Sequence, residues 1–206
     1  PTSPSSAATG LGYSKMAFIA GLLAHYIRGL GFKAIACGND TACSIPIAID
    51  AGLGELARNG LLITPAFGPR IRLAKVLTDM PLIADRPIEF GVWDFCLKCE
   101  KCAVKCPSQS IAFGEPTDKL NNISNRQGLL RWPINAVECL RFWAANGTDC
   151  ANCIRTCPFN KPTGWLHDTV RWGVRNLRWL NQFFLWMDDI CGYGKQTNAD
   201  KFWTMQ

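Results

Sequence analysis

The sequence predicts an α/β fold that continues into a small cysteine-held module and a helical tail. Helix-like and strand-like apolar patterns alternate through the first 90 residues, as in folds that pack helices against strands. From about Phe95 this periodicity gives way to closely spaced cysteines, and from Trp165 the pattern is helical again. We therefore expect three parts, residues 1–90, 91–164 and 165–206.

The elements of the first part follow from apolar spacing and from end signals. Ser14 is expected to cap a helix over residues 14–31, which ends at a glycine. A second helix is expected over residues 44–57, with Pro46 in its first turn. Strands are expected at residues 32–37, 59–65 and 72–80.

Composition and charge limit the class of protein. The 206 residues are 48% hydrophobic, which is typical of a globular chain with one good core. Every long apolar run is interrupted before about 18 residues, so no membrane-spanning segment is expected. The formal charge of +6 comes from scattered Lys and Arg, which gives no indication of a nucleic-acid partner. The chain starts at Pro1 without an export signal, so we expect a longer protein.

Residues 52–57 match the relaxed dinucleotide fingerprint G-x-G-x-x-A. That fingerprint must follow a strand and open a helix, whose N-terminus then meets the pyrophosphate. Here the preceding pattern is helical, and Arg58-Asn59-Gly60 interrupts the chain directly afterwards. A glycine-rich turn is therefore favoured over a nucleotide site.

Eight of the eleven cysteines form two groups, each closed by a proline. The groups are Cys96, Cys99, Cys102 and Cys106 before Pro107, and Cys139, Cys150, Cys153 and Cys157 before Pro158. In the bacterial run C-x2-C-x2-C-x3-C-P, three thiolates bind one cluster and the fourth binds the other. We therefore expect one [4Fe-4S] cluster on Cys96, Cys99, Cys102 and Cys157, and a second on Cys106, Cys139, Cys150 and Cys153.

Zinc and disulfides are the alternatives for these thiols. Zinc ribbons favour two separated C-x-x-C pairs, whereas here a third and a fourth cysteine follow the first pair. A disulfide between residues three apart would be strained. The ten residues between Cys139 and Cys150 leave room for a projecting loop at 141–149. The remaining Cys37, Cys43 and Cys191 are expected to be small buried side chains.

Four tryptophans of the tail recur at seven-residue intervals, which keeps them near one face of a helix. They are Trp165, Trp172, Trp179 and Trp186, with Arg171, Arg175 and Arg178 on a neighbouring face. The favoured interpretation is an aromatic ridge that packs onto the rest of the fold. Docking of this ridge on a membrane or a partner protein is the alternative.

Two clusters in one module indicate electron transfer, because four thiolates leave no open position for a substrate. Six stretches of the sequence then indicate, by resemblance, where these electrons go. They are GYSKMA, ACGNDT, GLGELARNGLLITPAFGPRIR, KVLTDMPL, FCLKCEKCAVKCPSQSI and ECLRFWAANGTDCANCIRTCPFNK. Together they resemble the C-terminal portion of the reductive dehalogenases of organohalide-respiring bacteria. The cysteine runs are shared with many ferredoxin-like proteins, whereas RNGLLIT-x-x-FGPR-x-R is more specific.

The resemblance implies a partial nitroreductase-like core that binds a corrinoid (a cobamide) base-off, and a ferredoxin-like module with two [4Fe-4S] clusters. The histidine motif D-x-H-x-x-G is absent, which agrees with base-off binding. The implied reaction replaces carbon–halogen by carbon–hydrogen in a small organohalide, such as a chlorinated alkene or alkane, in anaerobic respiration. It needs two electrons and one proton.

The matching motifs also imply residue roles. Tyr13 is expected to donate the proton, Arg72 to stabilise its phenolate, and Asn39 to contact the halogen. Thr9 and Trp143 match positions of the substrate pocket. The expected corrinoid contacts, partly through backbone, are Cys37, Gly38, Gly52, Gly54, Asn59, Gly60 and Leu61.

Partners and location follow from the resemblance as well. They are an upstream electron donor, a small membrane anchor protein, and a peripheral position on the outer face of the cell membrane. Two alternatives stay open. An epoxyqueuosine reductase-like enzyme has the same cofactors but acts on transfer RNA, and no basic RNA-binding tail supports it. A ferredoxin-type electron carrier is disfavoured by the combination of Tyr13, Asn39 and Arg72.

Overall fold

The computed structural model describes residues 4–196 and residue 204. Its elements, in chain order, are α1 (Pro4–Gly29), β1 (Ala34–Cys37), α2 (Ser44–Asp50), β2 (Glu55–Leu56), β3 (Leu62–Ile63), β4 (Lys75–Thr78), α3 (Val92–Lys98), α4 (Lys101–Val104), α5 (Ala136–Asn146), α6 (Asn152–Arg155), α7 (Trp165–Asn176), the 3-10 helix η1 (Arg178–Leu180) and α8 (Asn181–Ile190). The end of the predicted tail, at 197–203 and 205–206, lies outside the described residues.

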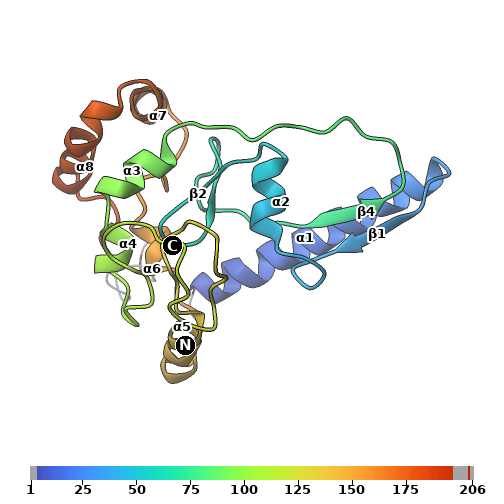
Figure 1. Cartoon of the computed structure of the whole chain (residues 1–206), viewed down its shortest axis with the longest axis horizontal. Helices are drawn as coiled ribbons and strands as arrows, with labels where there is room; N and C mark the ends of the chain where they lie inside the picture. Colours follow the sequence, from blue (N-terminus) through green and yellow to red (C-terminus); the bar gives the residue numbers. More distant parts are fainter. Residues whose placement is uncertain (1–3, 197–203, 205–206) are drawn as a thin grey trace.

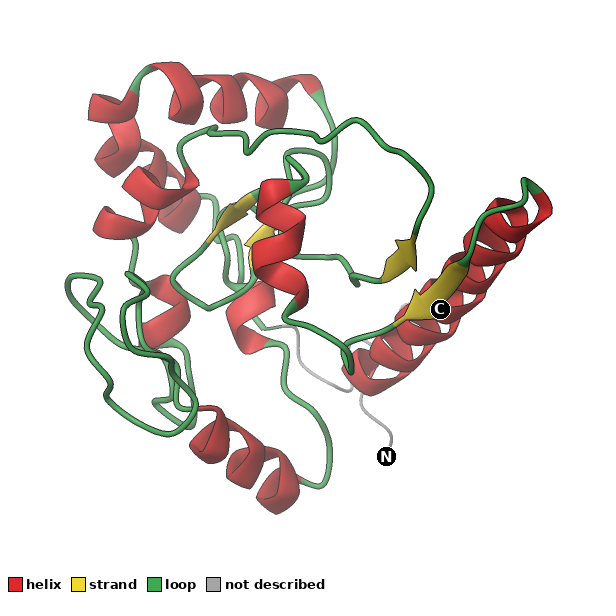
Figure 2. Ribbon diagram, turned by 45° about the vertical axis from the view of Figure 1, so that its right-hand side comes forward, coloured by secondary structure: helices red, strands yellow, loops and turns green. Residues whose placement is uncertain are grey.

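One end of the molecule is formed by α1 packed along the antiparallel pair of β1 and β4 (Figure 1; Figure 2). Ala24, Ile27 and Ala34 form the small core between them. The register pairs Cys37 with Lys75, so Lys75 lies beside the point where the chain leaves β1 toward Asn39. A long connection without helix or strand, residues 79–91, then leads from β4 back to α3 (Figure 1).

The main core draws on all three predicted parts of the chain. Ala57 and Ile63 from the first part meet Val92, Phe95, Trp132 and Phe159 from the second, and Val174 and Leu185 from the third. The side chain of Glu55 adds a polar link, because its carboxylate accepts the backbone N–H groups of Val92 and Trp93 at the start of α3. The bounds of the three parts stay a prediction, but the parts pack as one body around this core.

The prediction of a glycine-rich turn at residues 52–57 is confirmed. The helix expected over 44–57 ends at Asp50, because Gly52 adopts a φ of +67°, and the chain then enters β2. At Gly54 a Cβ would lie 2.1 Å from the carbonyl oxygen of Ile63. The close pairing of β2 with β3 therefore requires glycine there.

The first helix differs from its prediction. It begins at Pro4, well before Ser14, because proline suits a first helical turn and Gly10 and Gly12 stay helical. Gly12 makes room for Arg72, whose Cγ would lie 3.2 Å from a Cβ at that position. Within the described residues, α1 is long and apolar enough to cross a membrane by length and composition alone, which the interrupted apolar runs did not predict; the core helix of a soluble protein passes the same test.

Several smaller expectations are also wrong. Residues 141–146, expected in a loop, continue α5, which closes at Gly147 with a φ of +71°. Cys37 is buried as expected, whereas Cys43 and Cys191 are exposed. The predicted strands exist but are shorter, because their ends turn into loops outside the paired residues.

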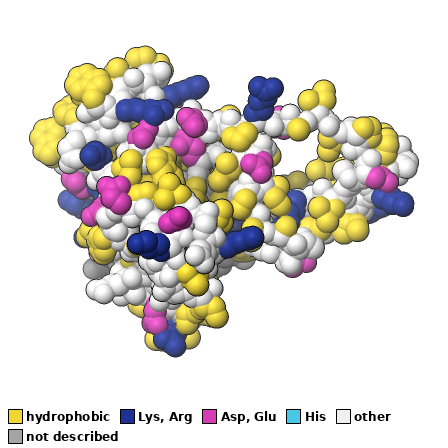
Figure 3. All heavy atoms as spheres, viewed as in Figure 1, with side chains coloured by type: hydrophobic (Ala, Val, Ile, Leu, Met, Phe, Trp, Pro, Cys, Tyr) yellow, Lys and Arg dark blue, Asp and Glu magenta, His cyan; other side chains and the backbone are white. Residues whose placement is uncertain are grey.

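The tryptophan ridge does not pack onto the rest of the fold. The four tryptophans are between 57% and 82% exposed, and η1 interrupts the helix between α7 and α8. Val174 and Leu185 face the core instead. Hydrophobic side chains gather on the outer side of the end formed by α7 and α8, at the upper left of Figure 3. The alternative of a docking surface therefore remains open.

Gly68→Ala is expected to destabilise the fold strongly. Gly68 has a φ of +57°, which costs a side-chain-bearing residue about 1–3 kcal/mol. A Cβ there would also lie 2.2 Å from the carbonyl oxygen of Phe159. Urea unfolding of the full-length protein measures the loss. Gly128→Ala is the matched control, because Gly128 has a φ of +81° with no atom within 4 Å of its Cβ position. Equal losses in both variants would contradict the steric part of this account.

Candidate functional site

The structure gathers the eight spaced cysteines into two sets. Set 1 comprises Cys96, Cys99, Cys102 and Cys157, which are all buried. Set 2 comprises Cys106, Cys139, Cys150 and Cys153, which are partly exposed. The two runs meet because α4 packs against α6, and this contact brings Cys157 back to the first run and Cys106 to the second. All eight thiols are free.

The electrostatic coupling of the thiols mostly follows the same two sets, with one link between them, because, after burial, Cys153 contributes to raising the pKa of Cys102. After burial, the neighbouring thiols of Cys96, Cys99 and Cys102 contribute to raising the pKa of Cys157. Burial likewise raises the pKa of Cys153 to about 12, with contributions from Cys150, Cys106 and Cys139. The two ligand sets stay a prediction from the crossed bacterial spacing, and the coupling of Cys157 to the first run is compatible with it.

The donor chemistry fits iron–sulfur clusters. Burial raises the pKa of Cys96 to about 12 and that of Cys99 to about 11, so binding of a metal cluster must displace their protons. Across residues 4–196 and 204, no three His, Cys, Asp or Glu side chains are arranged to hold a single metal ion. The fit rests on the donor type, the number of thiols and their grouping.

Tyr13, Asn39 and Arg72 come together from three different elements. Tyr13 lies in α1, Asn39 in the loop after β1, and Arg72 in the loop before β4. The Nδ2 of Asn39 donates to the Tyr13 hydroxyl at 3.1 Å. The guanidinium carbon of Arg72 lies 5.1 Å from the centroid of the Tyr13 ring. The cation therefore lies over the ring, and the amide binds the phenol oxygen.

A chain of hydrogen bonds behind Asn39 determines the direction of its bond to Tyr13. The ammonium of Lys75 donates to Ser44 Oγ at 3.1 Å, and it also donates to the carbonyl of Gly38. Ser44 Oγ in turn donates to Asn39 Oδ1 at 3.2 Å. An ammonium can only donate, so Asn39 presents its NH₂ to Tyr13. The proton of Tyr13 is thereby left to point away from Asn39.

Arg72 is held in place from α1 and from the region of set 2. Its Nη2 donates to Thr9 Oγ1 at 3.0 Å, and Thr9 donates to Asp149 Oδ2 at 2.9 Å. Ser6 Oγ donates to the other carboxylate oxygen of Asp149 at 2.8 Å. Asp149 directly precedes Cys150, so these bonds join the Tyr13 site to set 2.

A large open hollow of about 1190 Å³ lies between α1 and residues 67–76. Thr9 and Arg72 line it, together with the basic side chains of Lys15, Arg70 and Lys75. Of the two predicted pocket residues, Thr9 therefore lies at the hollow. Trp143 lies in α5, is 38% exposed, and does not line it.

The expected corrinoid contacts fall in two places. Cys37 and Gly38 are at the end of β1, and Gly52, Gly54, Asn59, Gly60 and Leu61 are in or beside the β2–β3 hairpin. Asn59 is buried, and its Oδ1 accepts the N–H of Leu61. Contact with a cofactor would therefore come mainly from backbone, at positions such as Gly60, which has a φ of +72°. His25 lies in α1 and His167 in α7, so neither belongs to this region.

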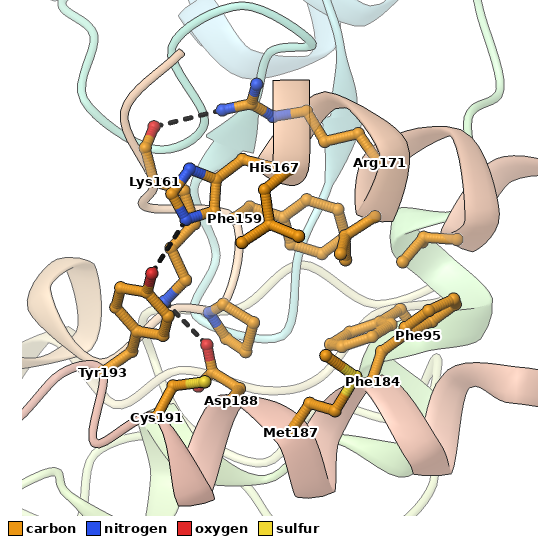
Figure 4. Close-up of a pocket in the computed structure, with 14 residues that line it drawn as sticks. Phe95, Phe159, Lys161, His167, Arg171, Phe184, Met187, Asp188, Cys191 and Tyr193 are labelled. Atoms are coloured by element: carbon orange, nitrogen blue, oxygen red, sulfur yellow. Dashed lines mark hydrogen bonds and ion pairs between the residues drawn. The ribbon is translucent and has the colours of Figure 1, made fainter. Parts of the chain in front are cut away.

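A second, smaller cavity of about 90 Å³ lies under α7 and α8 (Figure 4). Its polar side chains are already engaged with one another. Lys161 pairs with Asp188 at 2.6 Å and lies over the ring of Tyr193, whose hydroxyl is 3.0 Å from His167 Nε2. We therefore place the candidate active site at Tyr13 rather than at this cavity.

Sequence spacing missed Lys75, Ser44 and Asp149. Each reaches the site through a tertiary contact. Lys75 and Asp149 lie within the matched stretches KVLTDMPL and ECLRFWAANGTDCANCIRTCPFNK, but the resemblance implied no role for them. The register of β1 with β4 places Lys75, and the start of α2 places Ser44. Ser44 lies outside the matched stretches, so only the fold brings it to Asn39.

Comparisons with known proteins agree with the cysteine pattern. Residues 95–161 match the 4Fe-4S dicluster domain family. The chain is 42% identical over 203 residues to the tetrachloroethene reductive dehalogenase of Sulfurospirillum multivorans, covering 98% of this chain and 40% of that protein. It is 28% identical over 187 residues to the trichloroethene reductive dehalogenase of Dehalococcoides mccartyi, covering 88% and 32%. The chain thus spans about two fifths of the relative first named.

Solved structures give the same likeness. A catabolic reductive dehalogenase named NpRdhA matches with a TM-score of 0.80 and 31% identity, over 89% of this chain and 26% of that one. An epoxyqueuosine reductase crystallised with a modified tRNA stem loop matches with a TM-score of 0.52 and 23% identity, over 70% and 38%. The second likeness concerns the fold alone. The predicted class, an α/β core with a two-cluster module and a helical tail, is confirmed.

Proposed function

We propose, on the premise that this chain is homologous to the reductive dehalogenases, that its protein reductively dehalogenates a small organohalide such as a chlorinated alkene. The observation that carries the proposal is the meeting of the Tyr13 hydroxyl, the Asn39 amide and the Arg72 guanidinium beside a hollow. The 4Fe-4S dicluster domain in the same chain supplies the electron path.

The chemistry requires two electrons and one proton, which convert R–X into R–H and release X⁻. The cysteines of sets 1 and 2 would hold the two clusters, which would supply these electrons one at a time. A base-off corrinoid, held by residues 37–38 and by the β2–β3 hairpin, would supply the metal at which the carbon–halogen bond breaks. Tyr13 donates the proton of its hydroxyl. Because Asn39 donates to the hydroxyl oxygen, this proton points away from the amide. Arg72, over the ring, stabilises the phenolate that remains.

The test uses the full-length protein reconstituted with iron, sulfide and a corrinoid under anaerobic conditions. Halide release from a chlorinated alkene, with an electron donor present, is the expected result. Reduction of epoxyqueuosine in tRNA without halide release would support the alternative enzyme. Eight iron atoms without bound corrinoid and without either activity would support an electron carrier.

Lys75→Met is expected to lower the kcat of halide release by about 10-fold or more, with little change in KM. The methionine keeps the length of the side chain but cannot donate, so Asn39 loses the bonds that orient it. Lys75→Arg, which can still donate, is expected to recover most of the activity. Lys15→Met is the control, because Lys15 lines the same hollow with an exposed side chain. An equal loss in the Lys15 variant would point to net charge rather than orientation.

We also propose a peripheral position on the outer face of the cell membrane, held by a small anchor protein, and an upstream donor that supplies the electrons. The exposed tryptophans of α7 to α8, with Arg175 and Arg178 nearby, are the candidate contact. Trp172→Glu together with Trp179→Glu is expected to release the full-length protein from membranes in a flotation assay, because charge opposes burial of this face. The circular dichroism spectrum checks folding. Unchanged membrane recruitment of a folded variant would exclude this face.

A further inference from the structure

Arg58 brings a buried positive charge to the set 1 loop, which is the segment of residues 96–102 that joins α3 to α4. Its side chain is 1% exposed, and the residue lies in the turn after β2. Its Nε donates to the carbonyl oxygens of Cys96 and Cys99 at 3.2 and 3.0 Å, and its Nη2 donates to Cys96 at 2.8 Å. Its Nη1 donates to the carbonyls of Ala112 and Gly114 at 3.0 and 2.9 Å. These bonds satisfy all three nitrogens but leave the charge uncompensated.

A charge buried this deeply calls for a counter-charge. The nearest carboxylate oxygen, Glu100 Oε1, lies 3.6 Å from Nη1, belongs to a side chain that is 39% exposed, and also accepts the N–H of Gly114. A partly exposed acid is a weak partner. An oxidised [4Fe-4S]²⁺ cluster on four thiolates carries a charge of about −2, and the loop that Arg58 holds is the one expected to carry such a cluster.

The influence of Arg58 already reaches three of the four thiols of set 1. Against the raising effect of burial, its charge lowers the pKa of Cys96, Cys99 and Cys102, and its backbone N–H hydrogen bonds to Cys96. Lys101 is also close to this set, but Asp188 and Asp189 bind its ammonium at 2.5 and 2.7 Å. Glu55 opposes Arg58 at Cys96. Two carboxylates pair closely with Lys101, whereas Arg58 has only the more distant Glu100. Of the two cations, Arg58 is therefore the less neutralised.

We propose that Arg58 is a positioning residue that clamps the set 1 loop and favours the reduced state of the cluster bound there. The inference rests on the proposed function only through the presence of that cluster. One electron from an upstream low-potential donor converts [4Fe-4S]²⁺ to [4Fe-4S]⁺, no proton moves, and the total charge changes from about −2 to about −3. A guanidinium remains protonated throughout the physiological pH range, so this preference does not depend on pH.

The placement of Arg58 also joins two functions in one residue. It precedes Asn59, Gly60 and Leu61, which are the expected corrinoid contacts, and its side chain binds the backbone of two cluster ligands. A shift of the hairpin would therefore move the cluster loop with it. Arg58 thereby fixes the set 1 loop relative to residues 59–61, the segment expected to contact the corrinoid.

The experiment is an EPR-monitored redox titration of the full-length protein after reconstitution with iron, sulfide and a corrinoid. Arg58→Met removes the charge, Arg58→Lys keeps it without the planar fork, and Glu100→Gln removes the opposing acid at a partly exposed position. Lys98→Met is the control, because Lys98 lies beside Cys99 in sequence with an exposed side chain. Iron content and halide release are measured on the same preparations.

Arg58→Met is expected to lower the ratio of reduced to oxidised set 1 cluster at fixed potential by about tenfold, a shift of about 59 mV for one electron. Arg58→Lys is expected to shift it less, Glu100→Gln to shift it the opposite way, and Lys98→Met to leave it in place. If Arg58→Met loses its iron, the Glu100→Gln shift decides. Unchanged potentials in Glu100→Gln and in every iron-retaining Arg58 variant overturn the inference. Shifted potentials without halide release from wild type overturn the proposed function instead.

Discussion

Tyr13→Phe is expected to reduce the kcat of halide release by at least about 100-fold, in the range that a positioned general acid contributes. The substitution removes the hydroxyl and keeps the ring. Arg72 can therefore still lie over the aromatic face, as it does 5.1 Å from the centroid in the native site. The measurement is steady-state halide release by the full-length protein loaded with both clusters and corrinoid. Cofactor contents should match those of the wild type, because Tyr13 belongs to neither cysteine set.

Tyr26 provides the matched control for this prediction. It lies in the same helix and is 64% exposed, against 40% for Tyr13. Tyr26→Phe removes an equivalent hydroxyl further along α1, outside the described set of Asn39 and Arg72 around Tyr13, and is expected to leave kcat unchanged. Retention of wild-type kcat by Tyr13→Phe would sink the assignment of Tyr13 as proton donor. Equal losses in both variants would point to a general effect on α1.

The predictions that succeeded from sequence are those that depend on short spacing. The cysteine groups were recognisable because a cluster needs thiolates at fixed short intervals, and the fold then brings the two runs together through α4 and α6. The turn at residues 52–57 was recognisable because Gly52 and Gly54 allow conformations that other residues resist. In both cases the local chemistry restricts the backbone.

The predictions that failed depend on what packs against a segment. The heptad of tryptophans marks one face of a helix, but the pattern is the same whether a face is buried or exposed, and here η1 breaks the helix and the rings are exposed. Arg58 shows the converse. In the sequence it interrupts the apolar pattern, whereas in the structure it is 1% exposed and binds four backbone carbonyls. Lys75 and Ser44 were missed because strand register and helix position, not spacing, bring them to Asn39.

Cys157→Ala and Cys106→Ala are expected to remove different clusters, each lowering the iron content from about eight to about four atoms per chain. The reason is the crossing of the fourth ligands. Burial and the thiols of Cys96, Cys99 and Cys102 raise the pKa of Cys157, while Cys106 contributes to raising the pKa of Cys139 and Cys153. Each cysteine is therefore coupled to the run to which it does not belong in sequence.

EPR spectroscopy of the reduced variants distinguishes crossed from uncrossed ligation. Under crossed ligation, Cys157→Ala loses the same signal as Cys96→Ala, and Cys106→Ala loses the same signal as Cys139→Ala. Uncrossed ligation would pair Cys106→Ala with Cys96→Ala instead. Cys191→Ala is the control, since Cys191 is exposed and outside both sets, and it should retain about eight iron atoms. Crossed ligation would also tie the two cysteine runs together. Each run would give three ligands to one cluster and its fourth ligand to the other, so each cluster would help to hold the loop that binds its neighbour.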